Sequence, residues 1–592
     1  MSENQDKHIA SVRHSLAHLL AATVVEMYPG SKNSIGPAIE NGFYQDFETP
    51  EPISEEDLPK IEARMREKLK TWGKFERREV SPEEARKEFA WNPYKLELIE
   101  DFSKDGQQLT FYVSGDFTDL CRGGHVEDSA EINPKAFKLT KISGAYWRGD
   151  QSKQQLQRIY GVAFGTPEEL KSYLDMMEEA KKRDHRKLGQ ELDLFVFSEL
   201  VGSGLPLFTP RGTVLREELA KFAESLRAGS GFERVSIPHI TKTELYKVSG
   251  HWDKFGDELF LVKSQETSDQ FALKPMNCPH HNQIYAARPR SYRDLPIKYF
   301  ETTTVYRDEK TGELGGLSRV RSISQDDSHA YCRRDQVEEV VGSLIGDVQT
   351  LYGTLGLPLR ARLSFRDASD KYLGEPELWQ QAQDVIRTLA KKNELEYFEA
   401  EGEAAFYGPK IDFMATDALG REHQVATVQL DFVQPERFEL EFTAEDGNPQ
   451  RPVMVHCAIL GSIERFLSVY IEHTAGRFPV WVAPEQVRIL TLNDDKNIVD
   501  FATTMAEQAR RLGLRVTVDA GNESVGKKIR NAELMKVPYT VVIGTKEVES
   551  GQLVPRVRKD IEVHTEHDPR TVDEFLKTVV HETKSRVSKT SL

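Results

Sequence analysis

The sequence is poor in cysteine, lacks long apolar runs and carries fewer positive than negative side chains. Its four cysteines are scattered through 592 residues, which is unlike a disulfide framework and typical of a protein of the reducing cytoplasm. No run of 18 apolar residues occurs, so the sequence predicts no transmembrane helix. The start, MSENQDKH, is polar and leans acidic, whereas a signal peptide begins basic and then apolar. We therefore expect a cytoplasmic protein without a membrane partner.

The excess of acidic side chains limits the partners. With 79 lysines and arginines against 95 aspartates and glutamates, the formal net charge is −16. Such a charge argues against a protein that coats nucleic acid without specificity, but local basic patches can still recognise RNA by its shape. At about 150 residues per domain, a chain of this length predicts three or four domains.

The first third of the chain predicts a mixed domain followed by a connector. Apolar residues at helical spacing predict a helix over 11–28. Thr166 followed by Pro167 predicts the start of another helix, which continues to about 192. That helix is polar on most faces, so we interpret it as a connecting helix. The first domain is expected to cover residues 1–182 with an α+β fold.

The middle and the end of the chain have opposite sheet patterns. Residues 299–332 alternate, turn at glycines and alternate again, which predicts an antiparallel hairpin in an antiparallel central domain over 187–480. Within 481–592 strands alternate with helices, which predicts a parallel α/β domain. The elements expected there are strands at 487–492, 514–518 and 539–543 and helices at 498–512 and 525–534. The fold class is therefore multidomain, combining α+β and α/β parts.

Two pairs of histidine and cysteine in the first domain suggest a chemical site. His14 and His18 lie four residues apart on one helix face, and Cys121 and His125 have the same spacing. Four such side chains are a zinc set by type. The alternative is a pocket without metal, in which histidine and cysteine position a water molecule. Lys95 stands in NPYKLELI, a strand-like run, and is expected at the surface.

Arginines in the middle domain suggest an anion site. Arg307, Arg319 and Arg321 lie on the two arms of the predicted hairpin, and a guanidinium offers a planar fork that suits polyphosphates. A charged surface hairpin is the plainer alternative. A strand also passes through Gly461 into a helix that carries Arg465 on its first turns, which brings a cation to the end of a sheet.

The amphipathic helix expected over 211–228 has two equally good interpretations. It can lie in a dimer interface, or it can be an ordinary helix of the core.

Several motifs together resemble one family. Residues 306–321 resemble the second signature of class II aminoacyl-tRNA synthetases, 461–465 the third and 232–238 the first. From end to end the chain is similar to the threonyl-tRNA synthetase family within that class. The motifs that carry this resemblance, in the family's order, are HSLAHLL, DLCRGGH, KPMNCP, GLSRVRSISQDDSH, AFYGPKIDF, TVQLDF, HCAILGSIERF and GTKEVESG.

The resemblance implies an activity, cofactors and partners. The expected reaction is the activation of L-threonine by ATP to threonyl-adenylate, followed by transfer to the 3′ end of tRNA(Thr). It also implies hydrolytic editing of seryl-tRNA(Thr), Mg²⁺ bound with ATP, one Zn²⁺ per subunit and a homodimer.

The resemblance assigns the synthetic site to the middle domain. Cys278, His329 and His456 are expected to bind the zinc, with an open position that the amino and hydroxyl groups of threonine fill. Valine lacks the hydroxyl, and a site that requires a polar partner rejects such an analogue by on the order of 10⁴. The residues expected to bind ATP are Arg307, Glu309, Arg319, Gln424 and Arg465. Those expected to bind threonine or the adenylate are Met276, Gln325, Asp327, Tyr407, Gln429 and Ser462. Arg307, Arg465 and Lys410 are the expected catalytic residues.

Compared with threonine, serine keeps the hydroxyl and lacks only a methyl group. The loss of that group lets a binding site prefer threonine over serine by only roughly 10–200-fold. A second, hydrolytic site is therefore expected, and the resemblance implies that it works without metal. Its residues are His14, His18, Lys95, Asp119, Cys121 and His125.

The C-terminal domain is expected to read the anticodon through Asn522, Glu547 and Arg556, with Lys527, Lys528 and Arg530 on the phosphates.

The sequence departs from the family pattern at two points, and two other functions are weighed against the expected one. The chain starts close to His14, so the ubiquitin-like domain that precedes this motif in many relatives is expected to be absent. Tyr44 is followed by Gln45 where the family often has a second tyrosine, so one editing contact is expected to differ. The rivals are a non-catalytic binding module on a synthetase fold and a synthetase for serine or proline.

Overall fold

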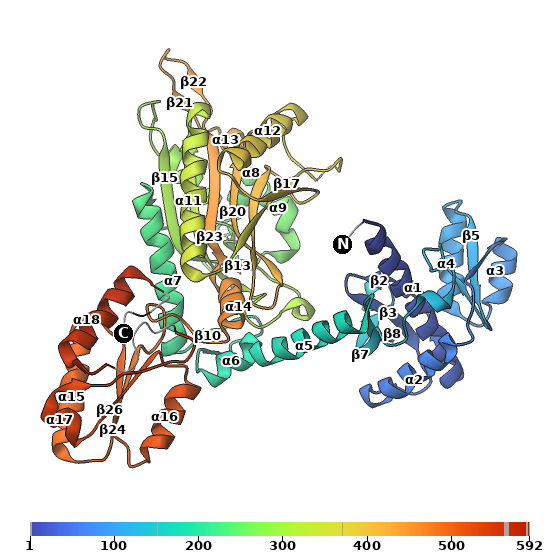
Figure 1. Ribbon diagram of the computed structural model, residues 1–592. Helices are drawn as coiled ribbons and strands as arrows, with labels where there is room; N and C mark the ends of the chain where they lie inside the picture. Colours follow the sequence, from blue (N-terminus) through green and yellow to red (C-terminus); the bar gives the residue numbers. More distant parts are fainter. Residues whose placement is uncertain (1–2, 151, 370, 562–567, 588–589, 591–592) are drawn as a thin grey trace. The chain divides into compact units, whose positions relative to one another are not determined.

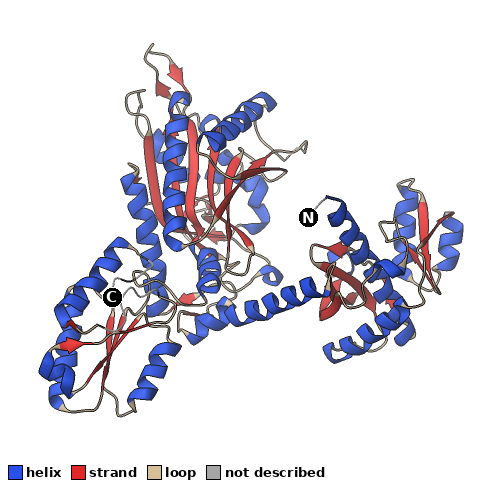
Figure 2. Ribbon diagram, viewed as in Figure 1, coloured by secondary structure: helices blue, strands red, loops and turns tan. Residues whose placement is uncertain are grey.

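A computed structural model of the protein describes residues 3–150, 152–369, 371–561, 568–587 and 590 (Figure 1). The chain forms two compact units, which divide between Glu179 and Ala180. Both units mix helices with strands (Figure 2). No helix within the described ranges is both long and apolar enough to cross a lipid bilayer.

The N-terminal unit is built around one long helix. α1 (Glu3–Met27) packs on a five-stranded antiparallel sheet with the order β1-β3-β8-β7, in which β2 pairs with β3. Leu16, Leu19 and Val24 are fully buried in the core that the helix and the sheet share. The helix expected over 11–28 is confirmed, and it begins earlier. The other elements of this layer are β1 (Lys32–Asn33), β2 (Ala38–Ile39), β3 (Gly42–Glu48), α2 (Leu58–Leu69), β7 (Phe137–Tyr146) and β8 (Gln155–Ala163).

A second, three-stranded sheet completes this unit and corrects one prediction. It has the order β4-β5-β6, and its elements are β4 (Glu76–Val80), α3 (Pro82–Glu88), α4 (Pro93–Lys104), β5 (Leu109–Ser114) and β6 (Phe117–Leu120). The expectation that Lys95 lies at the surface in a strand-like run is wrong, because it lies in α4 and is 3% exposed. The Asn92 side chain accepts from the backbone N–H of Tyr94 and Lys95, and Pro93 begins the helix, so cap and proline override the short alternation.

The connecting helix is interrupted where the sequence predicted continuity. α5 (Pro167–Arg183) begins as expected, since the Thr166 hydroxyl accepts from Glu169 N–H and the Glu169 carboxylate accepts from Thr166 N–H. The helix ends at Arg183, and α6 (His185–Glu191) starts afresh after Asp184. Asp184 leaves the helical conformation and its side chain accepts from Arg186 N–H, which makes it the cap of a second helix.

An eight-stranded sheet forms the centre of the second unit, with the order β11-β15-β16-β23-β20-β19-β17-β18. All neighbouring strands are antiparallel except the two edge pairs, so the predicted antiparallel sheet is confirmed. The hairpin expected within 299–332 is confirmed as β15 (Ile297–Tyr306) and β16 (Ser322–Cys332). Apolar side chains of α7 (Pro210–Gly229), α11 (Val337–Leu355) and α14 (Ile463–Thr474) share the core of this sheet.

The second unit contains further strands of the central sheet and further helices and short strands around it. They are β9 (Phe195–Val196), β10 (Leu207–Phe208), β11 (Glu233–Arg234), β12 (Ile240–Lys242), α8 (Glu244–Ser249), α9 (His251–Phe255), β13 (Leu261–Lys263), β14 (Gln270–Leu273), α10 (Cys278–Ala286), β17 (Leu359–Phe365), α12 (Pro376–Lys392), β18 (Tyr397–Glu401), β19 (Lys410–Thr416), β20 (Glu422–Asp431), α13 (Val433–Arg437), β21 (Phe442–Thr443), β22 (Pro449–Gln450) and β23 (Val453–Ser462).

The end of the chain folds around a smaller sheet with the order β25-β24-β26-β28. β24 is parallel to both β25 and β26, while β28 is an antiparallel edge strand, so the predicted parallel α/β pattern is confirmed. Its elements are β24 (Val487–Thr491), α15 (Lys496–Arg511), β25 (Val516–Asp519), α16 (Val525–Leu534), β26 (Tyr539–Ile543), α17 (Thr545–Ser550), β27 (Gln552–Leu553), β28 (Arg556–Val557), β29 (Arg570–Thr571) and α18 (Val572–Ser585).

Candidate active sites

A cavity of about 950 Å³ opens on the central sheet, between the β15–β16 hairpin, β20, β23 and α14. Most of the residues that the sequence assigned to ATP and threonine meet there. They are Met276, Arg307, Glu309, Arg319, Gln325, Asp327, Tyr407, Gln424, Gln429, Ser462 and Arg465, together with His456 from the expected zinc set. The predicted site residues therefore converge on one cavity, although they come from widely separated parts of the chain.

Cys278, His329 and His456 lie together beside this cavity. One potential ligand atom of each lies within 4.8 Å of the others, and all three residues are buried. Cys278 begins α10, whereas His329 and His456 stand directly opposite each other on β16 and β23. Directly opposed residues on antiparallel strands project to the same face, so the register of these strands brings the two imidazoles together.

The surroundings of the two histidines leave one nitrogen of each ring available. His329 Nδ1 is 2.7 Å from His281 Nδ1, and His456 Nε2 is 2.8 Å from Asp431 Oδ2. His329 Nε2 is buried and makes no hydrogen bond to any described residue. Burial raises the pKa of the Cys278 thiol, and a bound cation would offset that cost of forming the thiolate. Two oriented imidazoles and a buried thiol fit a zinc ion.

Arg465 is available to an anion in the cavity. It lies on the first turn of α14, where the Ser462 hydroxyl accepts from its backbone N–H and caps the helix. Among the described residues, none forms a hydrogen bond or an ion pair with its guanidinium. The strand-to-helix transition predicted at Gly461 is confirmed, and the positive φ of 66° at that glycine explains why glycine is favoured there.

Asp326 is a structural support of this site that the sequence analysis missed. Its buried carboxylate accepts from the backbone N–H of Ile459, Leu460 and Gly461 at 2.8–3.0 Å. These bonds fix the end of β23, from which α14 and Arg465 follow. The signal was the adjacent pair Asp326-Asp327, because consecutive strand residues face opposite sides and cannot share one role.

Two predicted nucleotide contacts are engaged with each other, and Lys410 lies apart. Arg319 Nε is 2.7 Å from Glu309 Oε2. Lys410 is not among the residues that line the cavity, and its Nζ is 2.8 Å from Asp412 Oδ2. The Gln424 amide also donates to Asp412, at 2.8 Å, so the buried carboxylate links Lys410 to the cavity wall.

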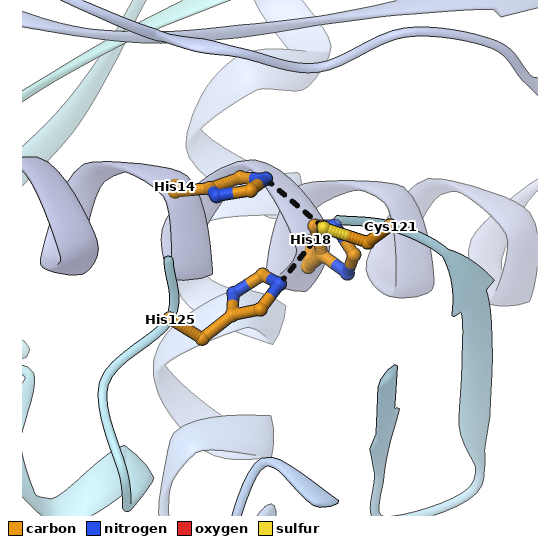
Figure 3. Close-up of side chains that lie close together, drawn as sticks. All are labelled: His14, His18, Cys121 and His125. Atoms are coloured by element: carbon orange, nitrogen blue, oxygen red, sulfur yellow. Dashed lines mark hydrogen bonds between the residues drawn. The ribbon is translucent and has the colours of Figure 1, made fainter. Parts of the chain in front are cut away.

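A second cavity, of about 750 Å³, lies in the N-terminal unit. α1 supplies His14 and His18, and the segment after β6 supplies Cys121 and His125 (Figure 3). One potential ligand atom of each of the four side chains lies within 4.8 Å of the others. Cys121 Sγ is 3.5 Å from His14 Nε2 and 3.3 Å from His125 Nε2. The structure therefore brings the predicted cluster together.

The hydrogen bonds of Ser15, a residue that the sequence analysis passed over, orient one of these rings. The Val126 N–H donates to Ser15 Oγ at 3.1 Å, so the Ser15 hydroxyl hydrogen is free to face His125 Nδ1 at 3.2 Å. That leaves the ring proton of His125 on Nε2, toward Cys121. Burial raises the pKa of Cys121 to about 11 and lowers that of His125 to about 3, so both groups are neutral at neutral pH.

The wall of this cavity contains a buried ion pair and the unusual glutamine. Lys95 Nζ is 2.7 Å from Asp119 Oδ1, and the side chains are only 4% and 3% exposed. Asn33 donates to the other carboxylate oxygen at 2.9 Å. Gln45 is 1% exposed and lines the same cavity. A Cβ on Gly36 would lie 1.8 Å from Gln45 Oε1, so glycine at this position leaves room for the Gln45 amide.

We predict that the N-terminal unit loses stability as the pH falls below 6.5. An unfolded histidine takes up a proton near that pH, whereas burial holds the folded pKa of His125 near 3 and also lowers those of His14 and His18. Between these values the unfolded state binds more protons, so each histidine costs up to about 1.4 kcal/mol per pH unit. Hydrogen–deuterium exchange of α1 in the full chain at pH 7, 6 and 5, corrected for intrinsic exchange rates, measures this loss.

The controls for the acid effect are two histidine variants. His125→Gln removes one titrating group and should flatten the pH dependence. His8→Gln changes a side chain that is 54% exposed and should leave the pH dependence as it is. Exchange in α1 that is indifferent to pH would contradict the prediction.

The residues expected to read the anticodon come from three different segments of the C-terminal α/β sheet region. Asn522 is exposed after β25, and Arg556 is exposed on β28 opposite Thr540, near the start of β26. Glu547 follows the end of β26 and accepts from Gly544 N–H, capping α17. The expectation that Lys528 binds phosphate is wrong, because it is fully buried and its Nζ donates to Thr491 O at 2.8 Å.

Comparisons with known proteins agree with this arrangement. The family model "tRNA synthetase class II core domain (G, H, P, S and T)" matches residues 260–474, "Anticodon binding domain" matches 486–582, and "Threonyl and Alanyl tRNA synthetase second additional domain" matches 109–160. A threonine–tRNA ligase of Gloeobacter violaceus is 49% identical over 94% of this chain and 90% of its own length. One of Synechococcus elongatus is 46% identical over 94% of this chain and 93% of its own length.

A solved structure is similar as well. The crystal structure of the RNA-binding domain of threonyl-tRNA synthetase from Cryptosporidium parvum is 34% identical, with a TM-score of 0.64 over 69% of this chain and 99% of that one. The relatives that match over nearly the whole chain, and the class II core, editing-type and anticodon-binding domains, lead to one conclusion. The chain belongs to the threonine–tRNA ligase family of class II aminoacyl-tRNA synthetases.

Proposed function

We propose that the 950 Å³ cavity activates L-threonine with ATP, releasing pyrophosphate, and then transfers the threonyl group to the 3′ end of tRNA(Thr). The observation that carries this proposal is the convergence of Cys278, His329 and His456 within 4.8 Å, beside a cavity that also holds the unengaged Arg465. A cysteine and two histidines recognise a metal, and the arginine recognises a phosphate. Both requirements of threonine activation thus lie at one place.

The amino-acid end of the cavity is shaped by polar side chains. Cys278, His329 and His456 would hold one Zn²⁺, which when bound supplies a Lewis acid that favours an amine bearing a neighbouring hydroxyl. Asp327 lies 3.7 Å from His329 Nε2, accepts from the Asn277 amide at 3.2 Å, and is set to receive the threonine amino group. The other residues proposed to bind threonine or the adenylate are Met276, Gln325, Tyr407, Gln429 and Ser462.

The nucleotide end is formed by arginines. Arg307 and Arg465 would hold the α-phosphate and stabilise the charge that spreads over it in the transition state. Glu309 and Arg319, which bond to each other, would exchange that contact for the adenine and the γ-phosphate. Gln424 lines the cavity beside them, and Mg²⁺ would accompany the phosphates. Lys410 contributes through Asp412 in this proposal.

The 750 Å³ cavity of the N-terminal unit is proposed to hydrolyse seryl-tRNA(Thr) without a metal. His14, Cys121 and His125 form a neutral chain of hydrogen-bonding groups that can orient a water molecule. Lys95 and Asp119 place a fixed charge pair in the wall, and His18 completes the cluster. A zinc site in this cluster remains the alternative, and zinc content separates the two.

The remaining proposals concern the rest of the chain. We assign editing to residues 1–182, synthesis to 187–480 and anticodon recognition to 481–592, with Asn522, Glu547 and Arg556 on the bases. A homodimer and a cytoplasmic location are proposed too. The reducing cytoplasm is supported by the four cysteines, none of which forms a disulfide.

Amino-acid-dependent ATP–pyrophosphate exchange tests the proposed reaction. We expect the highest kcat/KM with threonine, a value lower by roughly 10–200-fold with serine, and one lower by about 10⁴ with valine. Proline should give no exchange above background. A higher kcat/KM with serine or proline would reassign the substrate, and no exchange with any of the four would favour a binding module.

A further inference from the structure

His185 joins three separate elements beside the synthetic cavity. It begins α6 and is 7% exposed. Its backbone nitrogen and its Nδ1 lie 3.1 and 2.7 Å from Glu472 Oε1, near the end of α14. Its Nε2 lies 3.1 Å from the backbone nitrogen of Leu317, in the loop between β15 and β16. One side chain therefore connects α6, α14 and the loop.

The partners assign one tautomer to the His185 ring. A carboxylate only accepts, so Nδ1 carries the proton, whereas a backbone N–H only donates, so Nε2 offers its lone pair to Leu317. Burial opposes ionisation of Glu472, but hydrogen bonds from His185 and Arg421 lower its pKa overall. Arg421 Nη2 is 2.6 Å from the second carboxylate oxygen. The neutral ring is thus a fixed bridge between a charged acceptor and a loop amide.

The bridged loop carries a proposed phosphate contact. Leu317 lies two residues before Arg319, inside a turn in which Gly315 N–H donates to Arg319 O at 3.2 Å. The Leu317 side chain is fully buried in the same core as Leu188 of α6. Since its amide is bonded to His185 of α6 and its side chain is buried in this core, Leu317 fixes the position from which Arg319 extends to the cavity.

The loop approaches His185 closely at Gly316. This glycine has a φ of +56°, and a Cβ built on it would lie 2.4 Å from His185 Nε2. Any larger residue would push the loop from the ring. His185, Glu309, Arg319 and Glu472 all line the 950 Å³ cavity, so the bridge lies in the wall of the site itself.

We propose that His185 is a positioning residue for the nucleotide, which holds the loop bearing Arg319 by joining the Leu317 amide to Glu472. This proposal rests on the proposed binding of ATP in the 950 Å³ cavity. It predicts that His185 affects ATP more than threonine, because the residues proposed to bind threonine lie on β16, β20 and β23 or precede α10 and β19, and none of them lies in the loop that His185 holds.

Two conservative substitutions separate the two arms of the bridge. In His185→Asn the shorter amide can donate to Glu472 but cannot reach the Leu317 amide. In His185→Gln the longer side chain brings an acceptor oxygen near the position of Nε2. We expect the Asn variant to raise the KM for ATP about tenfold, since a buried N–H loses its acceptor. The Gln variant should stay within about threefold of the wild type, and the KM for threonine should stay within about twofold in both.

Exchange kinetics of the amides report on the bridge directly. Hydrogen–deuterium exchange of the peptide 310–321 in the full chain should be faster in His185→Asn and near wild type in His185→Gln. Gly316→Ala should act like the Asn variant from the side of the loop. Gly312→Ala is the matched control, because a Cβ at Gly312 would meet nothing within 4 Å. Lys187→Ala controls for a change at an exposed position of α6.

The outcomes distinguish this proposal from the proposed function. Equal effects of Asn and Gln, an equal rise in the KM values of ATP and threonine, or unchanged loop exchange in His185→Asn would overturn the role of His185. A wild-type chain without threonine-dependent exchange would instead overturn the proposed reaction. In that case, faster loop exchange and weaker equilibrium binding of ATP in His185→Asn alone would still support the bridge.

Discussion

Cys278→Ser is expected to abolish zinc binding in the central domain and, with it, threonine activation. A serine hydroxyl does not ionise to give the thiolate that zinc takes from cysteine. We expect about one zinc per chain in the wild type and none in the variant, by elemental analysis of the purified protein. Threonine-dependent ATP–pyrophosphate exchange should fall by at least about 10³-fold, because discrimination and orientation at a polar site are worth on the order of 10⁴.

Cys332→Ser is the matched control for this loss. Cys332 is also buried on β16, three residues after His329, and its Sγ contacts Val453 O at 3.7 Å instead of the ligand set. The control should keep its zinc and its exchange activity. Full zinc content in Cys278→Ser would contradict the assignment. Two zinc ions in the wild type and one in the variant would show that the cluster around Cys121 also binds metal, against our proposal for editing.

Arg465→Ala is expected to lower kcat for adenylate formation by about 10²–10³-fold, the usual cost of removing one preorganised donor from a transition state. The Arg465 guanidinium has no partner among the described residues that it must release before it binds a phosphate. Asp326 also fixes the end of β23, which precedes Arg465, so the arginine is already oriented before the substrate binds. Arg465→Lys should recover only part of the rate, because an ammonium lacks the planar fork. Single-turnover formation of the adenylate measures the effect.

The KM for threonine should change little in both Arg465 variants, because the residue faces the phosphates. Arg477→Ala is a suitable control, since Arg477 is an exposed arginine that follows α14 and does not line the cavity. An unchanged kcat in Arg465→Ala would remove this residue from the proposed mechanism.

Local patterns predicted the elements of this protein well, and distant contacts poorly. The hairpin within 299–332 follows from the alternation of residue types along its two arms, and the strand at 539–543 follows from the succession of strand and helix patterns around it; both signals are local. The meeting of Cys278, His329 and His456 is not local, because it depends on the register of β16 against β23. No spacing along the chain encodes that register, so the sequence connects these three residues only through the resemblance to the family.

The errors also have local causes. Lys95 was misplaced because Leu-Glu-Leu alternates like a strand, although the cap Asn92 and Pro93 marked the start of a helix. The break at Asp184 was missed because the residues around it are good helix formers. Lys528 looked like a phosphate ligand, yet its aliphatic stem and ammonium are buried against Thr491. In each of the three cases, a hydrogen bond between a side chain and the backbone determines the observed conformation or burial.

The buried pair of Lys95 and Asp119 constrains how this enzyme can evolve. Replacing one partner alone would leave an unpaired charge in the interior, at a cost of about 3–5 kcal/mol, a large share of the roughly 5–15 kcal/mol by which a folded domain is stable. A lineage could change the two positions together, or exchange both for neutral residues, whereas each single replacement passes through a less stable protein. The two residues, 24 positions apart in sequence, should therefore be inherited as a unit.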